Sequence, residues 1–509
     1  MIRWGVGMGD VGAAAVAQCA VPHRLASVDI AIIAAYLGAM IVVGVIVARR
    51  VHGFRDFFIA GGRLTTPLLV CTLVSTYYGL DVTFGTSETA FYEGVAAFVA
   101  YSAPFYLFYV LTAVLVAPRL KRLDALSLPE AIGNAYGAQA RIAAALASFV
   151  YSAPILGVAG MGLIGTVFFG LEPWQGCAIG GAVATVYTML GGLLADALTD
   201  TVQFVVMCVT AAVAAVVMLC TVGGPEAIGA RLGPEVLAPL GTLSSWEVLV
   251  FAVVAMTPLV EPAFYQRTFA AVNARQVVKA LLIGAVLWAS YDWLVVYLGL
   301  AGRDLVAAGR LPAGLDGSEV LLHVAAIALP PGLLGLFVAG CLAAAMSTVD
   351  SYTLIAAGNV VYDGWQTATG RRLSDRSLLL ATRVLVLVTM AAAIALALLF
   401  ERLRDAWIFM STVLLSTVLW PMLAVLFAPR LATRRAGRWS TTVGLTVSVA
   451  LFVLFEVAGT PTVDGSMALL LPGVGVELQR ESALLFTLPV AALGFAAGAA
   501  ADRQRGAAT

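Results

Sequence analysis

The sequence predicts an all-α polytopic membrane protein with about thirteen transmembrane helices. Of its 509 residues, 61% are hydrophobic and 11% are charged, less than half of the roughly 25% charged residues in a soluble domain. Apolar stretches follow one another almost end to end, and each is long enough, at ~20 residues, to cross a bilayer. Loops rich and poor in Lys and Arg alternate along the chain, which is typical of a multi-pass protein. The lipid bilayer is therefore the first expected partner.

The predicted spans leave no room for a soluble domain between them. The largest connections, about 302–318 and 459–481, are too short to fold independently. Residues 1–27 are interpreted as an N-terminal extension, because few positive charges precede their weakly apolar stretch and no signal peptide is indicated. We place the spans near 28–48, 66–93, 96–117, 141–170, 174–192, 197–222, 246–264, 277–300, 332–360, 378–400, 407–427, 439–458 and 483–501.

The distribution of basic residues predicts the orientation of the chain. Short cytoplasmic loops carry an excess of Lys and Arg, and this excess falls in every second loop if the N-terminus is outside. The C-terminus is then cytoplasmic, and we expect a multi-pass protein of the plasma (inner) membrane. The basic residues of the predicted inside loops and tail are Arg49, Arg50, Arg55, Arg63, Arg119, Lys121, Arg122, Arg267, Arg275, Lys279, Arg371, Arg372, Arg376, Arg430, Arg434, Arg435, Arg438, Arg503 and Arg505.

Charge, cysteines and motifs argue against several classes of function. The net charge is zero, so no nucleic-acid partner is expected. The six cysteines are scattered without a CxxC pair, which argues against zinc and redox sites. No Walker loop, HExxH, GxSxG or Rossmann fingerprint occurs in its proper context. We therefore expect neither an enzyme nor an organic cofactor.

Two of the predicted spans are interrupted in the middle. Residues 75–83 of the second span are polar and contain a glycine, and residues 257–262 of the seventh contain two prolines around Glu261. Backbone groups freed at such breaks are tolerated at membrane depth only where they line a cavity or bind something. Corresponding interruptions in two halves indicate an inverted-repeat transporter with a site at the midplane. The alternative is that isolated Gly and Pro are common in membrane helices.

Carboxylates within the spans mark candidate sites, because each costs several kcal/mol at membrane depth unless it is paired. Asp81 and Glu261 lie in the two interruptions, where they could face one cavity and meet a cation. Pairing with polar backbone is the alternative. Together with nearby aromatic residues such as Tyr77 and Phe264, they favour an amine-bearing solute. Asp292 is interpreted as a satisfied buried acid.

Four short segments, taken together and in this order, form a pattern that is specific enough to indicate a protein family. Residues 56–63 read DFFIAGGR, 191–203 read GGLLADALTDTVQ, 265–271 read YQRTFAA and 346–348 read MST. Over roughly residues 28–430, this pattern resembles the sodium:solute symporter family, which includes the sodium–glucose, sodium–proline and choline carriers. Val82 and Glu261 stand where sugar carriers have glutamine and asparagine, so a sugar is less expected. Asp196 replaces a residue that is usually apolar.

The resemblance implies a five-plus-five inverted-repeat core of the leucine-transporter type that works by alternating access. It divides the chain into the extension 1–27, a leading transmembrane helix at 28–50, a first inverted repeat at 64–222 and a second at 245–428. Two C-terminal transmembrane helices and a tail follow at 429–509.

The resemblance also implies binding residues. Sodium would be held by the carbonyls of Ser75, Tyr78 and Ala344 and by the hydroxyls of Ser347 and Thr348. The alternative for these small residues is close helix packing. Asp200 falls on an acid of the inner ion pathway, to which we also assign Asp350. Solute contacts would come from Tyr77, Asp81, Val82, Glu261, Phe264 and Tyr265.

The resulting hypothesis is a sodium-coupled symporter that imports a small organic solute, with an amine-bearing solute favoured. Sodium is the expected coupling ion and the only expected metal. Two alternatives remain: a transporter-like membrane sensor of a solute, and a proton-coupled carrier of the same fold. The solute's identity, the sodium stoichiometry and the oligomeric state do not follow from the sequence.

Overall fold

A computed structural model describes residues 25–49, 53–398, 403–461, 467–470 and 477–507. The predicted extension thus lies almost entirely outside the described residues. Up to residue 240, the helices are α2 Ser27–Ala48, α3 Phe54–Ile59, η1 Ala60–Gly62, α4 Thr66–Tyr77, α5 Leu80–Glu93, η2 Ala97–Ser102, α6 Ala103–Leu111, η3 Thr112–Val116, α7 Ala117–Leu120, α8 Leu128–Tyr136, α9 Ala138–Ser152, α10 Ile155–Phe169, α11 Pro173–Val222, α12 Pro225–Leu232 and η4 Pro234–Leu237.

The second half repeats this pattern of long apolar helices with short helices between them. Its helices are α13 Ser245–Val254, η5 Thr257–Leu259, α14 Pro262–Ala270, α15 Ala274–Ala307, η6 Gly317–Glu319, α16 Val320–Ala328, α17 Leu333–Gly358, η7 Asn359–Trp365, α18 Gln366–Thr369, α19 Asp375–Ala397, α20 Leu403–Phe427, α21 Arg434–Ala458, η8 Arg480–Ser482 and α22 Ala483–Ala507.

The number of membrane spans agrees approximately with the prediction of thirteen. Among the described residues, eleven helices are long and apolar enough to cross a membrane, and the bent pair α4–α5 makes a twelfth. The remaining predicted span, 174–192, is the first part of α11, which leaves the helical conformation at Gly192 (φ 57°, ψ −160°). A Cβ at this glycine would overlap the carbonyl oxygen of Phe57. Glycine therefore permits both the break and the close contact.

The two predicted interruptions are present in the structure. Between α4 and α5, Tyr78 (φ −98°, ψ 57°) and Gly79 (ψ 179°) are not helical, and the two helices meet at a bend of 52°. Between α13 and α14 the chain forms the short η5, and Glu261 is extended (ψ 117°). Pro262 then starts α14. At this first helical position the backbone N–H has no partner within the helix in any case, so a proline without an N–H is tolerated.

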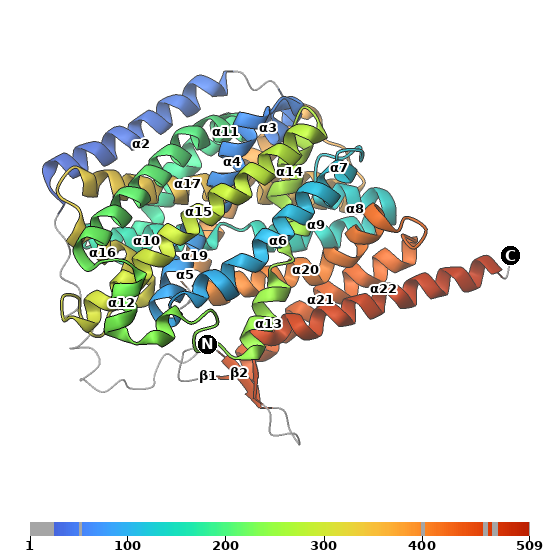
Figure 1. The fold of residues 1–509 in the computed structure, drawn as a ribbon. Helices are drawn as coiled ribbons and strands as arrows, with labels where there is room; N and C mark the ends of the chain where they lie inside the picture. The colour runs from blue at the N-terminus through green and yellow to red at the C-terminus, as the bar shows by residue number, and fades with distance from the viewer. Residues whose placement is uncertain (1–24, 50–52, 399–402, 462–466, 471–476, 508–509) are drawn as a thin grey trace.

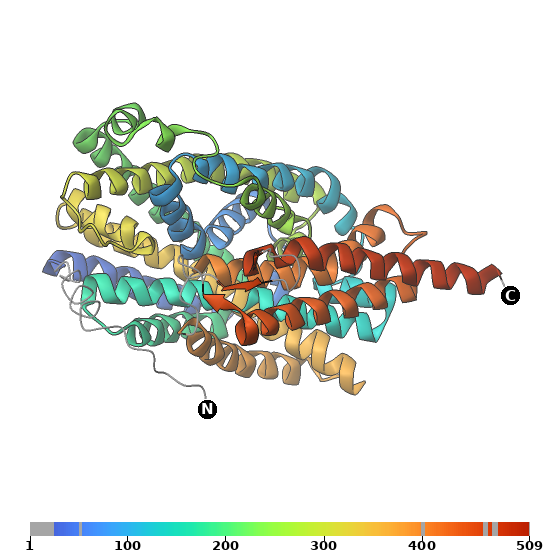
Figure 2. The same cartoon turned by 90° about the horizontal axis from the view of Figure 1, so that it is seen from below.

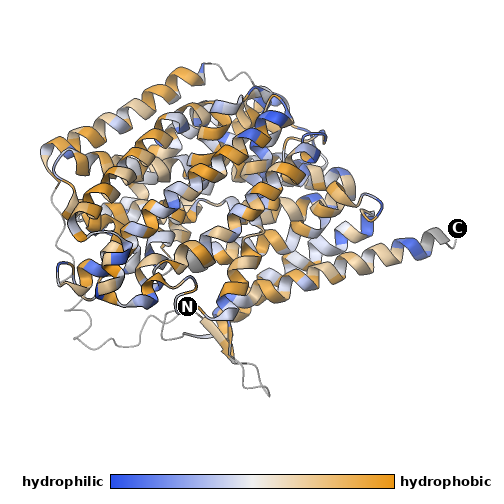
Figure 3. Cartoon of the chain, viewed as in Figure 1, coloured by the Kyte–Doolittle hydropathy of each residue, from blue (hydrophilic) through white to orange (hydrophobic). Residues whose placement is uncertain are grey.

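The bundle has two distinct ends and an apolar circumference. The short helices α3, α7 and α8 lie toward one end with the C-terminal end of α22, whereas α12 and α16 lie toward the other (Figure 1). The last turns of α22 project beyond the remaining helices in both views (Figure 2). Apolar residues run along the helices, and hydrophilic ones concentrate near their ends (Figure 3). Large outward-facing apolar side chains such as Val286 and Leu493 are exposed, as expected for a surface in contact with lipid.

The helix α17 is the most deeply buried of the spans, and its N-terminus is fixed by the leading helix. The carboxylate of Asp29, which is 1% exposed, accepts hydrogen bonds from the backbone N–H groups of Gly332 (2.6 Å) and Gly335 (2.7 Å). A negative group is stabilised at a helix N-terminus. This contact connects α2 to the helix that carries Ser347 and Thr348.

The connection between α21 and α22 adds a feature to the all-α prediction. It contains a small antiparallel sheet of β1 Thr460–Pro461, β2 Met467–Leu470 and β3 Glu477–Gln479, in the order β1-β2-β3. Ala468 pairs with both Thr460 and Gln479. The sheet lies on the surface of the bundle, beside α13 and the start of α22 (Figure 1).

Candidate functional site

An aromatic cavity lies beside the break between α4 and α5. It encloses about 540 Å³ of atom-free space, including the part open to solvent. Aromatic side chains dominate its wall, and the described lining residues include one carboxylate, Asp292, and no Lys, Arg or His. The lining residues are Thr76, Tyr77, Tyr78, Val82, Tyr101, Ser102, Phe105, Tyr106, Tyr109, Tyr151, Asp292, Thr348, Tyr352 and Trp407.

A group of buried oxygens adjoins this cavity where α17 crosses the end of α4. The hydroxyl of Thr348 donates to the carbonyl of Thr76 (2.9 Å) and is within 3.2 Å of its own helix carbonyl at Ala344. The hydroxyl of Ser347 donates to the carboxylate of Asp200. Ser347 and Asp200 are fully buried. Because Thr76 and Thr348 also line the cavity, the oxygen group and the cavity share a wall.

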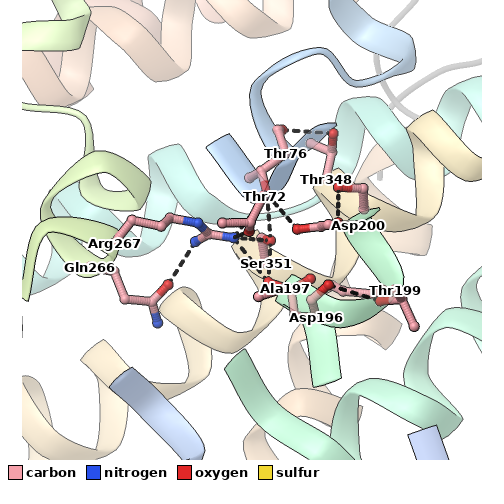
Figure 4. A network of polar contacts seen from close by, with 12 residues as sticks. Thr72, Thr76, Asp196, Ala197, Thr199, Asp200, Gln266, Arg267, Thr348 and Ser351 are labelled. Carbon is pink, nitrogen blue, oxygen red and sulfur yellow. Dashed lines mark hydrogen bonds and ion pairs between the residues drawn. The ribbon is translucent and has the colours of Figure 1, made fainter. Parts of the chain in front are cut away.

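Next to these oxygens, the buried guanidinium of Arg267 connects four helices (Figure 4). Its Nη2 lies 2.9 Å from Asp196 Oδ2 and 2.8 Å from Thr76 Oγ1, and it also contacts the hydroxyl of Ser351. Its Nη1 donates to Gln266 Oε1 at 2.8 Å. These partners belong to α11, α4, α17 and α14, so Arg267 links both interrupted helices to the bundle.

The charges of this Arg267 cluster do not balance. It contains the carboxylates of Asp196 and Asp200 and a single guanidinium, which leaves one negative charge when both acids are ionised. Asp200 is 0% exposed, and its oxygens are contacted by the hydroxyls of Ser347 and Thr76 (3.4 Å). An uncompensated charge at this depth costs several kcal/mol. One further monovalent cation or a proton would balance this charge.

The structure brings together part of the predicted site. Tyr77 and Val82 line the cavity, and Ser347, Thr348 and Ala344 lie at the oxygen group. The side chain of Asp81 lies outside the described residues. Ser75 is fully buried and its hydroxyl has no hydrogen-bond partner in the described part of the chain.

Three residues predicted to contact the solute lie behind the cavity wall. Phe264 packs on Tyr77, with ring centroids 4.9 Å apart, and the hydroxyl of Tyr265 donates to the carbonyl of Leu259 (2.8 Å). Glu261 is fully buried and accepts a hydrogen bond from Tyr352 (2.9 Å). Through Tyr352, which is a lining residue, Glu261 can orient the wall.

Asp350 and Asp292, two further acids named in the sequence analysis, occupy separate places. Asp350 faces away from the cavity, toward α11, where it accepts a hydrogen bond from Thr188 (2.6 Å). Asp292 is not the fully hydrogen-bonded acid that the sequence analysis expected. Tyr106 donates to its Oδ2, but Oδ1 has no hydrogen-bond partner among the described residues.

The sequence analysis missed most of the aromatic wall. Tyr101, Phe105 and Tyr109 recur every fourth residue and so fall on one face of the third span. This spacing was the available signal. Tyr151, Tyr352 and Trp407 come from three different spans, and only the tertiary packing brings them together.

Comparison with known proteins identifies the family. A model of the sodium:solute symporter family matches residues 57–444. The chain belongs to this family. Relatives include the high-affinity proline transporter PutP of Bacillus subtilis (strain 168), 24% identical over 378 residues that cover 68% of this chain and 74% of the relative. The sodium/proline symporter of Haemophilus influenzae is 25% identical over 399 residues, 71% of this chain and 76% of the relative. These relatives are transporters, which confirms the prediction that the chain is not an enzyme.

Solved structures of similar fold confirm the predicted architecture. A Na⁺-coupled sialic acid symporter, in a substrate-bound outward-open state, superposes with a TM-score of 0.75 at 16% identity and covers 93% of this chain and 98% of its own. A nucleobase-cation-symport-1 family transporter superposes with a TM-score of 0.50 at 13% identity, covering 86% and 92%. This chain therefore has the five-plus-five inverted-repeat core of the leucine-transporter type. The boundaries of the two repeats at 64–222 and 245–428 stay a prediction.

Proposed function

We propose that this family member imports a small, amine-bearing organic solute together with sodium by alternating access. One observation supports this proposal above all. Thr76 and Thr348 belong both to the group of buried oxygens and to the wall of the aromatic cavity. An ion bound at these oxygens would touch the residues that form the cavity wall. Binding of ion and solute is then coupled through direct contact.

Sodium suits the proposed ion site for two reasons. Backbone carbonyls freed by broken helices, together with hydroxyls, are the usual ligands of sodium in transporters of this architecture. The proposed set comprises the carbonyls of Ser75, Tyr78 and Ala344 and the hydroxyls of Ser347 and Thr348. Sodium would also compensate the remaining negative charge of the Arg267 cluster, with Asp200 beside its path. Asp350, which accepts a hydrogen bond from Thr188 of α11, would serve the same pathway at a later step.

Coupling requires that sodium bind more tightly to the solute-competent conformation, by about 1–3 kcal/mol. The bend between α4 and α5 and the break before α14 provide the places where the helices could move. Arg267 joins these two helices to α11 and α17. We infer that sodium orders this junction before the solute binds.

The first test is uptake by the purified protein in proteoliposomes. An inward sodium gradient is imposed, and a panel of labelled amines, amino acids, carboxylates and sugars is offered. We expect sodium-dependent uptake of an amine-bearing solute, and loss of that uptake in the Ser347→Ala/Thr348→Ala double variant. Thr353→Ala is the matched control, because this buried hydroxyl of the same helix donates to the carbonyl of Val349.

The other outcomes distinguish the alternatives. Uptake that is independent of sodium but driven by a proton gradient would indicate a proton-coupled carrier. In such a carrier Asp200 would be protonated, and no sodium ion would bind next to it. Tight solute binding without any uptake would indicate a membrane sensor. Sodium-driven uptake that survives the double variant would overturn the proposed ion site.

The proposal includes the orientation of the protein in the plasma membrane. The predicted inside loops contain α3, α7 and α8, which lie at one end of the bundle (Figure 1). An outside N-terminus and a cytoplasmic C-terminus place this basic end in the cytoplasm. Labelling of single cysteines introduced at Arg371 and Arg310 from either side of the membrane tests this orientation.

A further inference from the structure

Asp292 has an unused hydrogen-bonding position in the wall of the aromatic cavity. It lies on α15, is 2% exposed and lines the cavity. Tyr106 on α6 donates to its Oδ2, whereas Oδ1 receives no hydrogen bond from the described residues. A buried carboxylate with an unmatched oxygen is costly unless a donor or cation reaches it.

No described basic side chain supplies that partner. The lining residues include no Lys, Arg or His, and Arg267 is held by Asp196 and its neighbours in the Arg267 cluster. The missing partner of Asp292 must therefore come from a bound molecule, water included, or from a proton. The position of the acid in a cavity wall favours the bound molecule.

The surrounding rings favour a cation as that molecule. Trp407 lies 5.7 Å from both Tyr101 and Phe105, measured between ring centroids, and Tyr106 itself lies 5.9 Å from Tyr109. Aromatic faces attract cations, most strongly where water is excluded. A carboxylate among such rings forms a site for an ammonium group with an apolar body.

We propose that Asp292 Oδ1 binds the protonated amine of the transported solute, and that Asp292 determines the selectivity for amines. This inference rests on the proposed transport function. The preferred solute carries an ammonium with at least one N–H, because the open oxygen needs a hydrogen-bond donor. Asp292 thereby takes the role that the sequence analysis gave to Asp81 and Glu261.

Glu261 is less suited to this role because it lies behind the cavity wall, although its Oε2 also has no hydrogen-bond partner among the described residues. Its Oε1 accepts from Tyr352 and lies 3.4 Å from the backbone nitrogen of Ala263 at the start of α14. It is not among the lining residues. Of these two acids with an unpartnered oxygen, Asp292 is the one that lines the cavity.

Four ring solutes, compared as two pairs of similar size, test the inference in proteoliposomes with an inward sodium gradient. Pyrrolidine and proline carry a ring amine, whereas tetrahydrofuran and tetrahydrofuran-2-carboxylate replace it with an ether oxygen. Primary amines from the uptake panel extend the comparison to open-chain solutes. We expect binding or uptake of amine members only, with or without a carboxylate. Preferred uptake of an ether or a sugar would overturn the inference.

The variant Asp292→Asn keeps the size of the side chain but removes its charge. We expect its affinity for the accepted amine to fall by about ten- to a hundredfold, the loss of a charged hydrogen bond. Asp292→Glu should retain amine selectivity at reduced affinity. Asp304→Asn is the matched control, because this acid lies on the same helix but pairs with Arg231 (2.8 Å) instead of lining the cavity.

Sodium-induced thermal stabilisation, measured without solute, separates the two proposals. If Asp292→Asn retains sodium stabilisation and loses amine binding, the inference is supported. If Asp292→Asn transports the amine like the wild type, the inference fails while symport stands. If the wild type shows no stabilisation by sodium and no uptake of any panel member, the proposed function fails and the inference fails with it.

Discussion

Two polar sites lie on either side of Thr76 and are built in opposite ways. In the Arg267 cluster, a guanidinium and several hydroxyls surround the acids, and each named acid contacts at least one of them. In the aromatic cavity, Asp292 has a single hydroxyl partner and an open oxygen among rings. The first site joins helices, and the second leaves a position for a molecule from outside.

The difference explains why burial alone does not identify a binding acid. Asp196 and Asp292 are 4% and 2% exposed, yet Asp196 has Arg267 and Ser351 as partners. An acid paired with a buried guanidinium stabilises the arrangement of its helices, even though Oδ1 of Asp196 has no hydrogen-bond partner among the described residues. An acid with an unused oxygen beside a cavity is suited to ligand binding. Thr76 contributes to both sites and can transmit the state of one to the other.

The largest effect is expected for Arg267→Gln. This change leaves Asp196 and Asp200 buried without a compensating cation, and breaking a buried ion pair in this way costs about 3–5 kcal/mol. We expect a clear loss of thermal stability in detergent and loss of uptake. The Arg267→Gln/Asp196→Asn double variant removes one of the unpaired charges and should recover much of the stability. A single variant as stable as the wild type would show that the cluster does not join the helices.

A smaller effect is expected for Thr76→Val, which keeps the shape of the side chain and removes its hydroxyl. Arg267 loses an acceptor at 2.8 Å and Asp200 loses a weak donor, so we expect about 1–3 kcal/mol of destabilisation. Because Thr76 adjoins the ion and solute sites, the sodium concentration for half-maximal uptake should rise. Thr382→Val is a control, since that buried hydroxyl donates to a carbonyl of its own helix. Unchanged sodium dependence in Thr76→Val would separate the two sites.

Much of the fold could be predicted because local sequence determines it. Apolar length gave the spans, and Gly79 and the prolines around Glu261 gave the interruptions. The predicted helix ends were less accurate. For example, α15 spans Ala274–Ala307, whereas the predicted span was 277–300. Its polar end residues continue the helix, which a criterion based on apolar length does not detect.

The candidate site was harder to predict because its residues are distant in sequence. Asp292 and Tyr106 are 186 residues apart, and no local pattern indicates that they meet. Similarly, Asp196 was recognised as unusual, but its partner Arg267 becomes evident only when α11 and α14 are packed together. Ser347 and Thr348 were predictable because they form a short motif. Contacts between motifs required the structure.

The smallest effect is expected for Glu261→Gln. This variant tests whether Asp292, and not Glu261, binds the charged group of the solute. Glutamine retains an oxygen that can accept from Tyr352 and from the backbone of Ala263, so the wall should keep its shape. We expect solute affinity to change by less than about threefold, since these hydrogen bonds keep an acceptor. Equilibrium binding of the accepted amine, measured beside Asp292→Asn, checks this. A loss as large as that of Asp292→Asn would mean that Glu261 also serves the solute's charge. The solute-binding acids would then include Glu261 at the start of α14 as well as Asp292 on α15.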